Sequence, residues 1–172
     1  MSNVLTITGH RPQKLNSEWD GIGPVSDWIR DQIRGVIIAR DIKELVSGGA
    51  LGVDQLGIEV SIEEVVNVLA AIPCNNQDKK WFPKSKKRYQ FLMAHPLVEK
   101  HVVSPGEYTH NCMQVRNIWM VNYAKAHDGK VLAIWDGSSG GTGNCVEYAH
   151  KVGVEVIQRD PTEAVKNANN GE

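Results

Sequence analysis

Two glycine-rich segments combine uncovered backbone amides with hydroxyl side chains, a combination that suits an anionic ester. Residues 47–52 read SGGALG and residues 138–144 read SSGGTGN. Glycine leaves backbone N–H groups accessible, and a helix that begins in such a loop adds about half a positive charge at its N-terminus. We therefore predict that both segments bind phosphate. The residues expected to do so are Ser47, Gly48, Gly49, Ser139, Gly140, Gly141, Thr142, Gly143 and Asn144.

Neither segment has the spacing of a common nucleotide-binding fingerprint. The GxGxxG pattern of dinucleotide-binding folds and the GxxxxGK[ST] pattern of P-loop proteins do not occur in them. This argues against a kinase and against an ordinary dehydrogenase.

Glu147 and Arg116 are the candidate catalytic pair. If residues 138–144 surround a 5'-phosphate, Glu147 lies about one helical turn further on and faces the sugar. A carboxylate there can stabilise an oxocarbenium-like state or activate water, as in glycoside hydrolysis. Arg116 would hold that carboxylate ionised through a bidentate contact, or bind phosphate itself. The alternative is that Glu147 is a solvated residue favoured by the helix dipole.

Further polar residues stand where predicted strands end, and each has two interpretations. Gly9, His10 and Arg11 belong to TGHRP, where they either contact the ligand or fix the loop by hydrogen bonds. Asp54 either binds ribose hydroxyl groups or caps a helix. Asp136 ends a strand and is a hydrogen-bond acceptor for the loop that follows.

An aromatic residue and a basic cluster leave nucleic-acid binding open. Trp81 either stacks on a base or belongs to the core. Around it lie six cations, which are either a solvated helix face or a site for a polyphosphate strand. They are Lys79, Lys80, Lys84, Lys86, Lys87 and Arg88.

The composition bounds the class of protein. At 172 residues, with 41% apolar and 23% charged residues, we expect one domain over 1–160 and a polar, frayed tail over 161–172. The net charge of −1 argues against a chain built as a whole to neutralise nucleic acid. Three scattered cysteines predict a reducing compartment without disulfide or zinc, and we expect no metal and no cofactor. With no signal-like start and no long apolar stretch, we expect a cytoplasmic protein.

The apolar pattern alternates between strands and helices. Strands are predicted at 4–8, 43–46, 65–73, 130–137 and 154–158, and helices at 24–39, 51–64, 84–95, 110–126 and 144–153. This alternation predicts an α/β fold, a Rossmann-like three-layer sandwich with a mostly parallel sheet. In such folds the ligand binds at the carboxyl ends of the strands, where the strand order reverses.

The motifs resemble those of a known superfamily. Gly140, Gly141, Gly143 and Glu147 reproduce the GGxGxxxE core of the signature of LOG phosphoribohydrolases, and Arg116 is similar to the arginine that this family pairs with its glutamate. TGHRP, SGGALGVDQ, KKWFPKSKKRYQ and RNIWMV resemble still more the YpsA-type branch of the SLOG superfamily, which includes DprA. The resemblance covers roughly residues 4–157. The proline that opens the LOG motif is replaced by DGSS, and Asn144 stands at the position of its threonine.

Three functional hypotheses follow from the residues and the resemblance. The first is binding of a nucleotide or nucleotide-derived ligand at the strand ends, with LOG-like hydrolysis of the N-glycosidic bond of a nucleoside 5'-monophosphate. The second is a non-catalytic sensor or sequestering module for an ADP-ribose-like or cyclic nucleotide signal. The third is a DprA-like binder of single-stranded nucleic acid. The resemblance to LOG also implies a homodimer.

Overall fold

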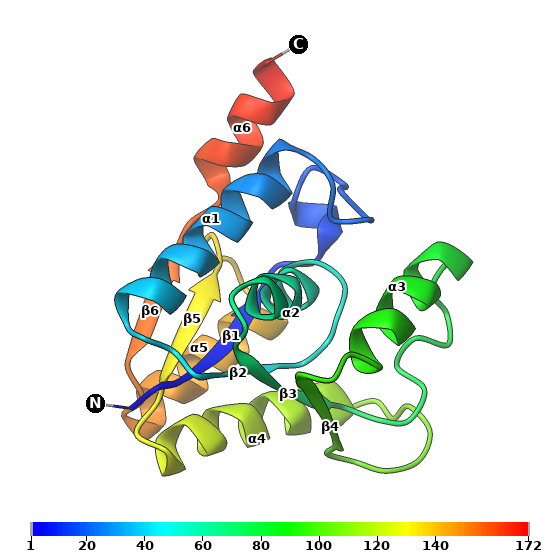
Figure 1. Ribbon diagram of the computed structural model, residues 1–172, viewed down its shortest axis with the longest axis vertical. Coiled ribbons are helices and arrows are strands. Elements are labelled where there is room, and N and C mark those ends of the chain that lie inside the picture. Colours follow the sequence, from blue (N-terminus) through cyan, green and yellow to red (C-terminus); the bar gives the residue numbers. More distant parts are fainter. Residues whose placement is uncertain (1, 172) are drawn as a thin grey trace.

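Six parallel strands form one sheet in the computed structural model, which describes residues 2–171 (Figure 1). The strands are Val4–Gly9 (β1), Glu44–Ser47 (β2), Asn67–Ile72 (β3), Val98–Val102 (β4), Lys130–Ile134 (β5) and Val156–Arg159 (β6). Their order is β4-β3-β2-β1-β5-β6. The chain runs outward from β1 to β4 and then returns to the other side of β1. The strand order therefore reverses between β1 and β5, and the predicted α/β class is confirmed.

Helices cover both faces of the sheet (Figure 1). They are Pro24–Ala39 (α1), Val53–Glu63 (α2), Pro83–Met93 (α3), Cys112–Ala126 (α4), Gly141–Val152 (α5) and Thr162–Asn170 (α6), with a short 3-10 turn at Pro12–Lys14. The largest apolar cluster joins α1 and α2 to β1, β2 and β5. Separate clusters join α4 and α5 to the other face. Within residues 2–171, no helix is long and apolar enough to cross a membrane.

The strand β1 shows why the central strands are apolar nearly throughout. Leu5 and Ile7 pack into the cluster with α1 and α2 and are fully buried. Thr6 points to the opposite face, where its hydroxyl group donates to the carbonyl of Met120 in α4 at 3.3 Å. A strand covered on both faces has no solvent side, so its sequence does not alternate between apolar and polar residues.

The edge strand β4 is the strand that the pattern did not predict. Its sequence VEKHV has an exposed central triplet, Glu99 to His101. β4 pairs in parallel with β3 and has no neighbour on its other side. Charged side chains on an edge strand discourage pairing with another chain, and they also hide the strand from an analysis of apolar periodicity.

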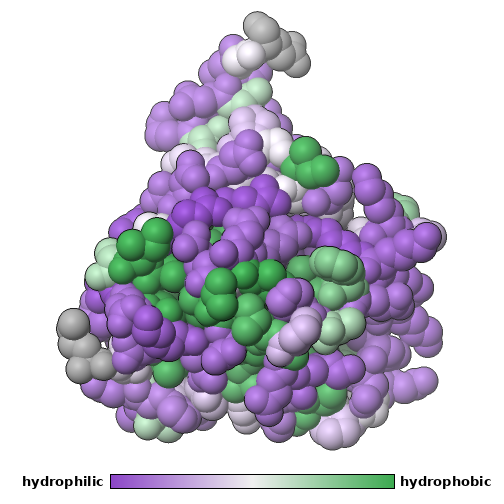
Figure 2. Space-filling view, viewed as in Figure 1, coloured by the Kyte–Doolittle hydropathy of each residue, from purple (hydrophilic) through white to green (hydrophobic). Residues whose placement is uncertain are grey.

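The polar segment after Pro161 is helix α6 rather than a frayed tail. Asp160 stabilises its start, because the Asp160 carboxylate accepts hydrogen bonds from the backbone N–H and the hydroxyl group of Thr162 at 2.9 and 2.6 Å. Val165 and Ala168 pack against the main apolar cluster. In Figure 2 the surface over α6 is mainly hydrophilic, whereas hydrophobic residues gather in the middle of this face, over α2 and its surroundings.

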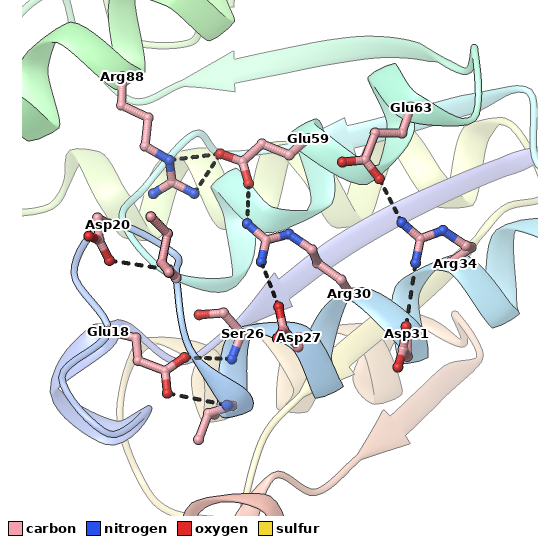
Figure 3. Close-up of polar contacts among 12 residues, drawn as sticks. Glu18, Asp20, Ser26, Asp27, Arg30, Asp31, Arg34, Glu59, Glu63 and Arg88 are labelled. Atoms are coloured by element: carbon pink, nitrogen blue, oxygen red, sulfur yellow. Dashed lines mark hydrogen bonds and ion pairs between the residues drawn. The ribbon is translucent and has the colours of Figure 1, made fainter. Parts of the chain in front are cut away.

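One carboxylate, that of Glu59, connects the helices α1, α2 and α3 through ion pairs (Figure 3). Glu59 of α2 accepts from Arg30 of α1 at 2.9 Å and from Arg88 of α3 at 2.7 Å. All three side chains are mostly buried, at 16 to 21% exposed. Two guanidinium groups therefore share one mostly buried carboxylate in a region of reduced solvent screening, and Arg30 also contacts the exposed Asp27 at 3.4 Å.

We expect Glu59→Gln to lower the free energy of unfolding by about 1–3 kcal/mol, because it leaves Arg88 without its carboxylate partner and Arg30 with the exposed Asp27, 3.4 Å away. Urea denaturation measures the change. Glu63→Gln is the control, since Glu63 is 53% exposed where it pairs with Arg34, and we expect a change below about 0.5 kcal/mol. Equal losses in the two variants would contradict the role given to Glu59.

Candidate functional site

A cleft of about 330 Å³ lies at the point where the strand order reverses. The ends of β1 and β5 supply two of its walls, through residues 8–11, Trp135 and residues 138–143. Ala50 and Asp54, from the segment after β2, and one face of α4 complete it. This is the position at which ligands bind in open α/β sheets.

His10 joins the loop after β1 to the loop after β5. Its Nε2 atom lies 3.1 Å from the backbone nitrogen of Asp136 and 3.0 Å from the Asp136 carboxylate. The imidazole is 7% exposed, and burial lowers the pKa of His10 although the carboxylate opposes the shift. A neutral ring accepts the N–H of Asp136 at Nε2. Both alternatives predicted for His10 thus have a geometric basis, because the side chain fixes the loop and also lines the cleft.

Asp136 holds the glycine-rich loop from outside the cleft lining. Its carboxylate accepts the backbone N–H of Ser138 at 2.9 Å. The hydrogen bonds from Ser138, followed by the interactions with His10, lower the pKa of Asp136 to about 2. Asp136 therefore stays ionised at neutral pH and serves as the acceptor for the loop.

Helix α5 begins inside the cleft without a capping side chain. Its N-cap is Gly140, whose φ of 143° lies in the region that favours glycine, and a Cβ there would meet open space. The backbone N–H groups of Gly141, Thr142 and Gly143 have no acceptor among residues 2–171. These residues and Ser139 line the cleft. The arrangement is that of an anion site at a helix N-terminus.

Lys14 brings a cation to the same loop. Its Nζ donates to the hydroxyl group of Ser138 at 2.6 Å, and both residues line the cleft. Trp135 donates from Nε1 to the carbonyl of Ser138 at 2.8 Å, and this hydrogen bond also holds the loop in place. The motif analysis did not identify Lys14. Its position four residues after His10, in the loop that follows a predicted strand end, was the signal available for finding it.

The SGG segment after β2 supports the cleft but does not line it. Ser47 is fully buried, and its hydroxyl group donates to the carbonyl of Asp54 at 2.8 Å and accepts from the N–H of Gly49 at 3.2 Å. The carbonyl of Gly48 accepts from Arg116 at 2.6 Å. The hydroxyl and amide groups predicted to bind phosphate here are thus occupied or turned inward, and Ala50 and Asp54 are the residues that reach the cleft.

Arg116 is a buried cation at the floor of the cleft, 4% exposed. Its Nη1 donates to the carbonyls of Gly48 and Ala71 at 2.6 and 3.3 Å, and its Nε donates to Asn117 at 2.8 Å. For Nη2 the recorded partner within residues 2–171 is the sulfur of Met113 at 3.9 Å, a weak acceptor. One edge of the guanidinium is therefore fixed by protein and the other is available to a ligand.

Asp54 provides the carboxylate of the cleft. It is 8% exposed and accepts the backbone N–H of Ala50 at 3.3 Å. Burial raises the pKa of Asp54, and the nearby Arg116 opposes the rise. The same burial lowers the pKa of Arg116, opposed by Asp54. In the described part of the chain these two side chains form no direct ion pair, so each retains capacity for a bound molecule.

Glu147 lies away from this cleft. Helix α5 starts at Gly141 rather than near Asn144, so Glu147 lies almost two turns into the helix. The buried face of α5 carries Cys145, Val146 and Ala149, and Glu147 is exposed. No hydrogen bond or ion pair of its side chain is found in residues 2–171, and neither Glu147 nor Asn144 lines the cleft. The structure does not bring Glu147 and Arg116 together.

Arg11 is exposed at the rim of the cleft, next to Gly9. The predicted site residues that the cleft does bring together are Gly9, His10, Arg11, Asp54, Arg116, Ser139, Gly140, Gly141, Thr142 and Gly143. Met113, Asn117 and Trp135 join them, although none of these three was among the predicted site residues.

Comparison with solved structures places the fold. DNA processing protein A from Helicobacter pylori, whose structure describes its mode of binding single-stranded DNA, matches with a TM-score of 0.61 and 18% identity over 98% of this chain and 72% of its own. The crystal structure of TM1055 matches with a TM-score of 0.58 and 17% identity over 91% of this chain and 73% of its own. At such identities the likeness is one of fold. These neighbours have SLOG-type folds, so the chain shares this Rossmann-like fold and carries a polar cleft at its switch point.

A relative with higher sequence identity assigns the chain to a family. The uncharacterized SPbeta prophage-derived protein YoqJ of Bacillus subtilis (strain 168) is 32% identical over 143 residues, which cover 72% of this chain and 81% of YoqJ. The chain belongs to the family of YoqJ. No protein-family model matches it.

Proposed function

We propose that this protein binds a nucleotide or nucleotide-derived ligand in the cleft between β1 and β5, with a phosphate group at the N-terminus of α5. One observation carries the proposal. Three backbone N–H groups that have no acceptor in the described residues 2–171, at Gly141, Thr142 and Gly143, line the same cleft as the Nη2 edge of Arg116. Helix dipole, amides and guanidinium all favour a dianion there.

The remaining lining supports a nucleotide rather than a simple anion. Met113, Met120 and Trp135 add apolar surface to the cleft, and the Asp54 carboxylate is an acceptor suited to ribose hydroxyl groups. A volume of about 330 Å³ is near the lower end of the range for small-molecule sites. A phosphorylated sugar or a mononucleotide fits this mixture of charged, polar and apolar groups.

Calorimetric titration with AMP, ribose 5-phosphate and adenosine tests the proposal. We expect saturable binding of the two phosphorylated compounds and much weaker binding of adenosine. Thermal unfolding should give the same ranking, because a ligand that binds the native state alone stabilises it by about 2.7 kcal/mol at a hundredfold excess over its Kd. Equal affinity for AMP and adenosine would contradict a phosphate site.

Hydrolysis of the N-glycosidic bond of a nucleoside 5'-monophosphate is a second candidate function, favoured by the presence of a buried carboxylate, Asp54, in the cleft. Water would add to the anomeric carbon, and the released base would take up a proton. The LOG resemblance implies Glu147 in the acidic role, whereas the geometry favours Asp54.

We expect Glu147→Gln to bind AMP with unchanged affinity, within about twofold, because Glu147 is exposed and remote from the cleft lining. Any release of free base from a panel of nucleoside monophosphates should likewise persist in Glu147→Gln and disappear in Asp54→Asn. Chromatographic detection of free base makes the comparison. Loss of binding or of base release in Glu147→Gln would restore that residue to the site.

Binding of single-stranded nucleic acid is the alternative that the basic cluster keeps open. Lys84 and Arg88 are paired with Asp20 and Glu59, while Lys79, Lys80 and Lys87 are exposed. Salt-sensitive retention of a labelled oligonucleotide that is lost on charge reversal at Lys86 and Lys87 would support it.

The LOG resemblance implies a homodimer, and this oligomeric state is likewise a proposal. Light scattering tests it by measuring the mass of the protein in solution.

A further inference from the structure

A second groove, of about 520 Å³, adjoins the cleft, and no role has been given to it so far. The two depressions share Arg11 and Met113. The groove extends from there between the segment before α3 and the segment before α4. A ligand that fills the cleft can therefore continue into the groove past Arg11.

The walls of the groove are fixed by hydrogen bonds between these two segments. The side-chain oxygen of Asn76 accepts the backbone N–H of Tyr108 at 2.7 Å, and that of Asn75 accepts the N–H of Gly106 at 2.5 Å. Trp81 packs edge-on against Tyr89, with ring centroids 5.3 Å apart. Trp81 and Tyr108 thus line the groove from two separately anchored segments.

Gln77 supports this wall of the groove from inside the protein. Its side chain is 9% exposed, and Nε2 donates to the carbonyl of Gly48 at 3.3 Å and to the hydroxyl group of Tyr89 at 3.2 Å. Because the Gly48 carbonyl can only accept, the amide orientation is fixed. Oε1 then has no partner among residues 2–171. Less than 1 Å² of Oε1 is exposed, so the Gln77 amide fixes this wall of the groove through its Nε2 contacts rather than serving as a ligand acceptor.

The charge of the groove favours phosphate near its junction with the cleft. Arg11, Lys79 and Lys80 line it together with one carboxylate, Glu107. Arg11 stands at the junction itself. Cations and two aromatic side chains are the groups that bind a phosphate followed by a nucleobase.

We propose that the groove holds the second nucleoside of a ligand built from two nucleosides joined by a phosphate bridge. The inference rests on the proposed function, since the terminal phosphate and the first nucleoside occupy the cleft. The bridging phosphate lies at Arg11, and the second base lies against Trp81 and Tyr108. The ligand class is therefore a short dinucleotide rather than a mononucleotide.

A length series tests the inference with AMP, pApA and pApApA as probes in calorimetric titrations. We expect pApA to bind at least about tenfold more tightly than AMP, since stacking of one additional base is enough for that gain, and pApApA to bind no more tightly than pApA. Equal affinity of AMP and pApA would remove the groove from the ligand site and leave the proposed function intact. An affinity that keeps rising with the number of nucleotides would overturn the inference, and would instead indicate a surface that binds single-stranded nucleic acid. Failure of AMP and ribose 5-phosphate to bind would instead remove the proposed function.

A variant on the groove wall gives the second readout. Tyr108→Ala changes an exposed residue, so we expect it to fold normally, to lose about tenfold in affinity for pApA and to bind AMP as the wild type does. Phe82→Ala is the matched control, because Phe82 is an exposed aromatic residue that follows Trp81 directly but does not line the groove. Equal affinities of these two variants for pApA would contradict the assignment.

Discussion

Arg116→Met is expected to weaken AMP binding by about 100-fold or more. The substitution removes the one buried cation of the cleft floor and leaves the buried Asp54 without an opposing charge. It also removes the donors to the carbonyls of Gly48 and Ala71. Truncating one partner of a buried charged network costs about 2–5 kcal/mol, and about 2.7 kcal/mol corresponds to the expected hundredfold loss.

Calorimetric titration with AMP measures this loss, and Arg40→Met is the matched control. Arg40 is exposed at the end of α1 and does not line the cleft, so its replacement should leave AMP binding unchanged. Near-ultraviolet circular dichroism establishes that each variant is folded. A folded Arg116→Met variant with wild-type affinity would show that the phosphate lies elsewhere.

Gly48→Ala is expected to lower the free energy of unfolding by about 1–3 kcal/mol and to abolish AMP binding at the same time. A Cβ at Gly48 would lie 2.0 Å from Nη1 of Arg116 and 2.8 Å from a carboxylate oxygen of Asp54. Arg116 must move to accommodate it. The movement breaks the hydrogen bond between Arg116 and the Gly48 carbonyl and displaces the guanidinium from the cleft.

Urea denaturation and AMP titration test both parts of this prediction, with Gly35→Ala as control. Gly35 lies inside α1, and a Cβ there meets nothing within 4 Å. Alanine is favoured over glycine in a helix, so the control should gain about 0.5–1 kcal/mol. If Gly48→Ala were as stable as the wild type and bound AMP normally, the close packing of Gly48 against Arg116 would be wrong.

The fold was predictable because its central elements carry strong local signals. The range predicted for the first helix, 24–39, is that of α1, and the predicted range 144–153 ends at Gly153, the left-handed C-cap of α5. The strands β1, β3 and β5 are apolar because helices cover both of their faces. β4 was not predicted, because an exposed edge strand lacks this continuous apolar pattern.

The position of the cleft was also predictable, but the role of each loop was not. Parallel strands fix which loops meet at one edge of the sheet, and the loops after β1 and β5 do meet there. Whether an amide in those loops faces a ligand or a neighbouring side chain depends on tertiary contacts. Gly48 illustrates this, since its segment looks like a phosphate loop but packs against Arg116.

The relation between Arg116 and an acidic partner shows the limit of motif spacing. The spacing of Glu147 after the glycines fits the LOG signature. However, α5 begins at Gly141, three residues before the predicted helix start at residue 144. Each helical residue turns the side chain by about 100°, so a shift of the start changes which face and which turn a residue occupies. Asp54, which is distant in sequence, is the carboxylate that shares the cleft with Arg116.

Titration of isotope-labelled protein with AMP, followed by amide nitrogen–hydrogen NMR spectra, tests the central claim most directly. The account predicts large, saturating shifts at the amides of Gly141, Thr142 and Gly143, because these groups would donate to the phosphate. Adenosine should leave them nearly unchanged. Saturable AMP binding that leaves these three amides unshifted, with changes confined to other parts of the chain, would contradict a phosphate site at the start of α5.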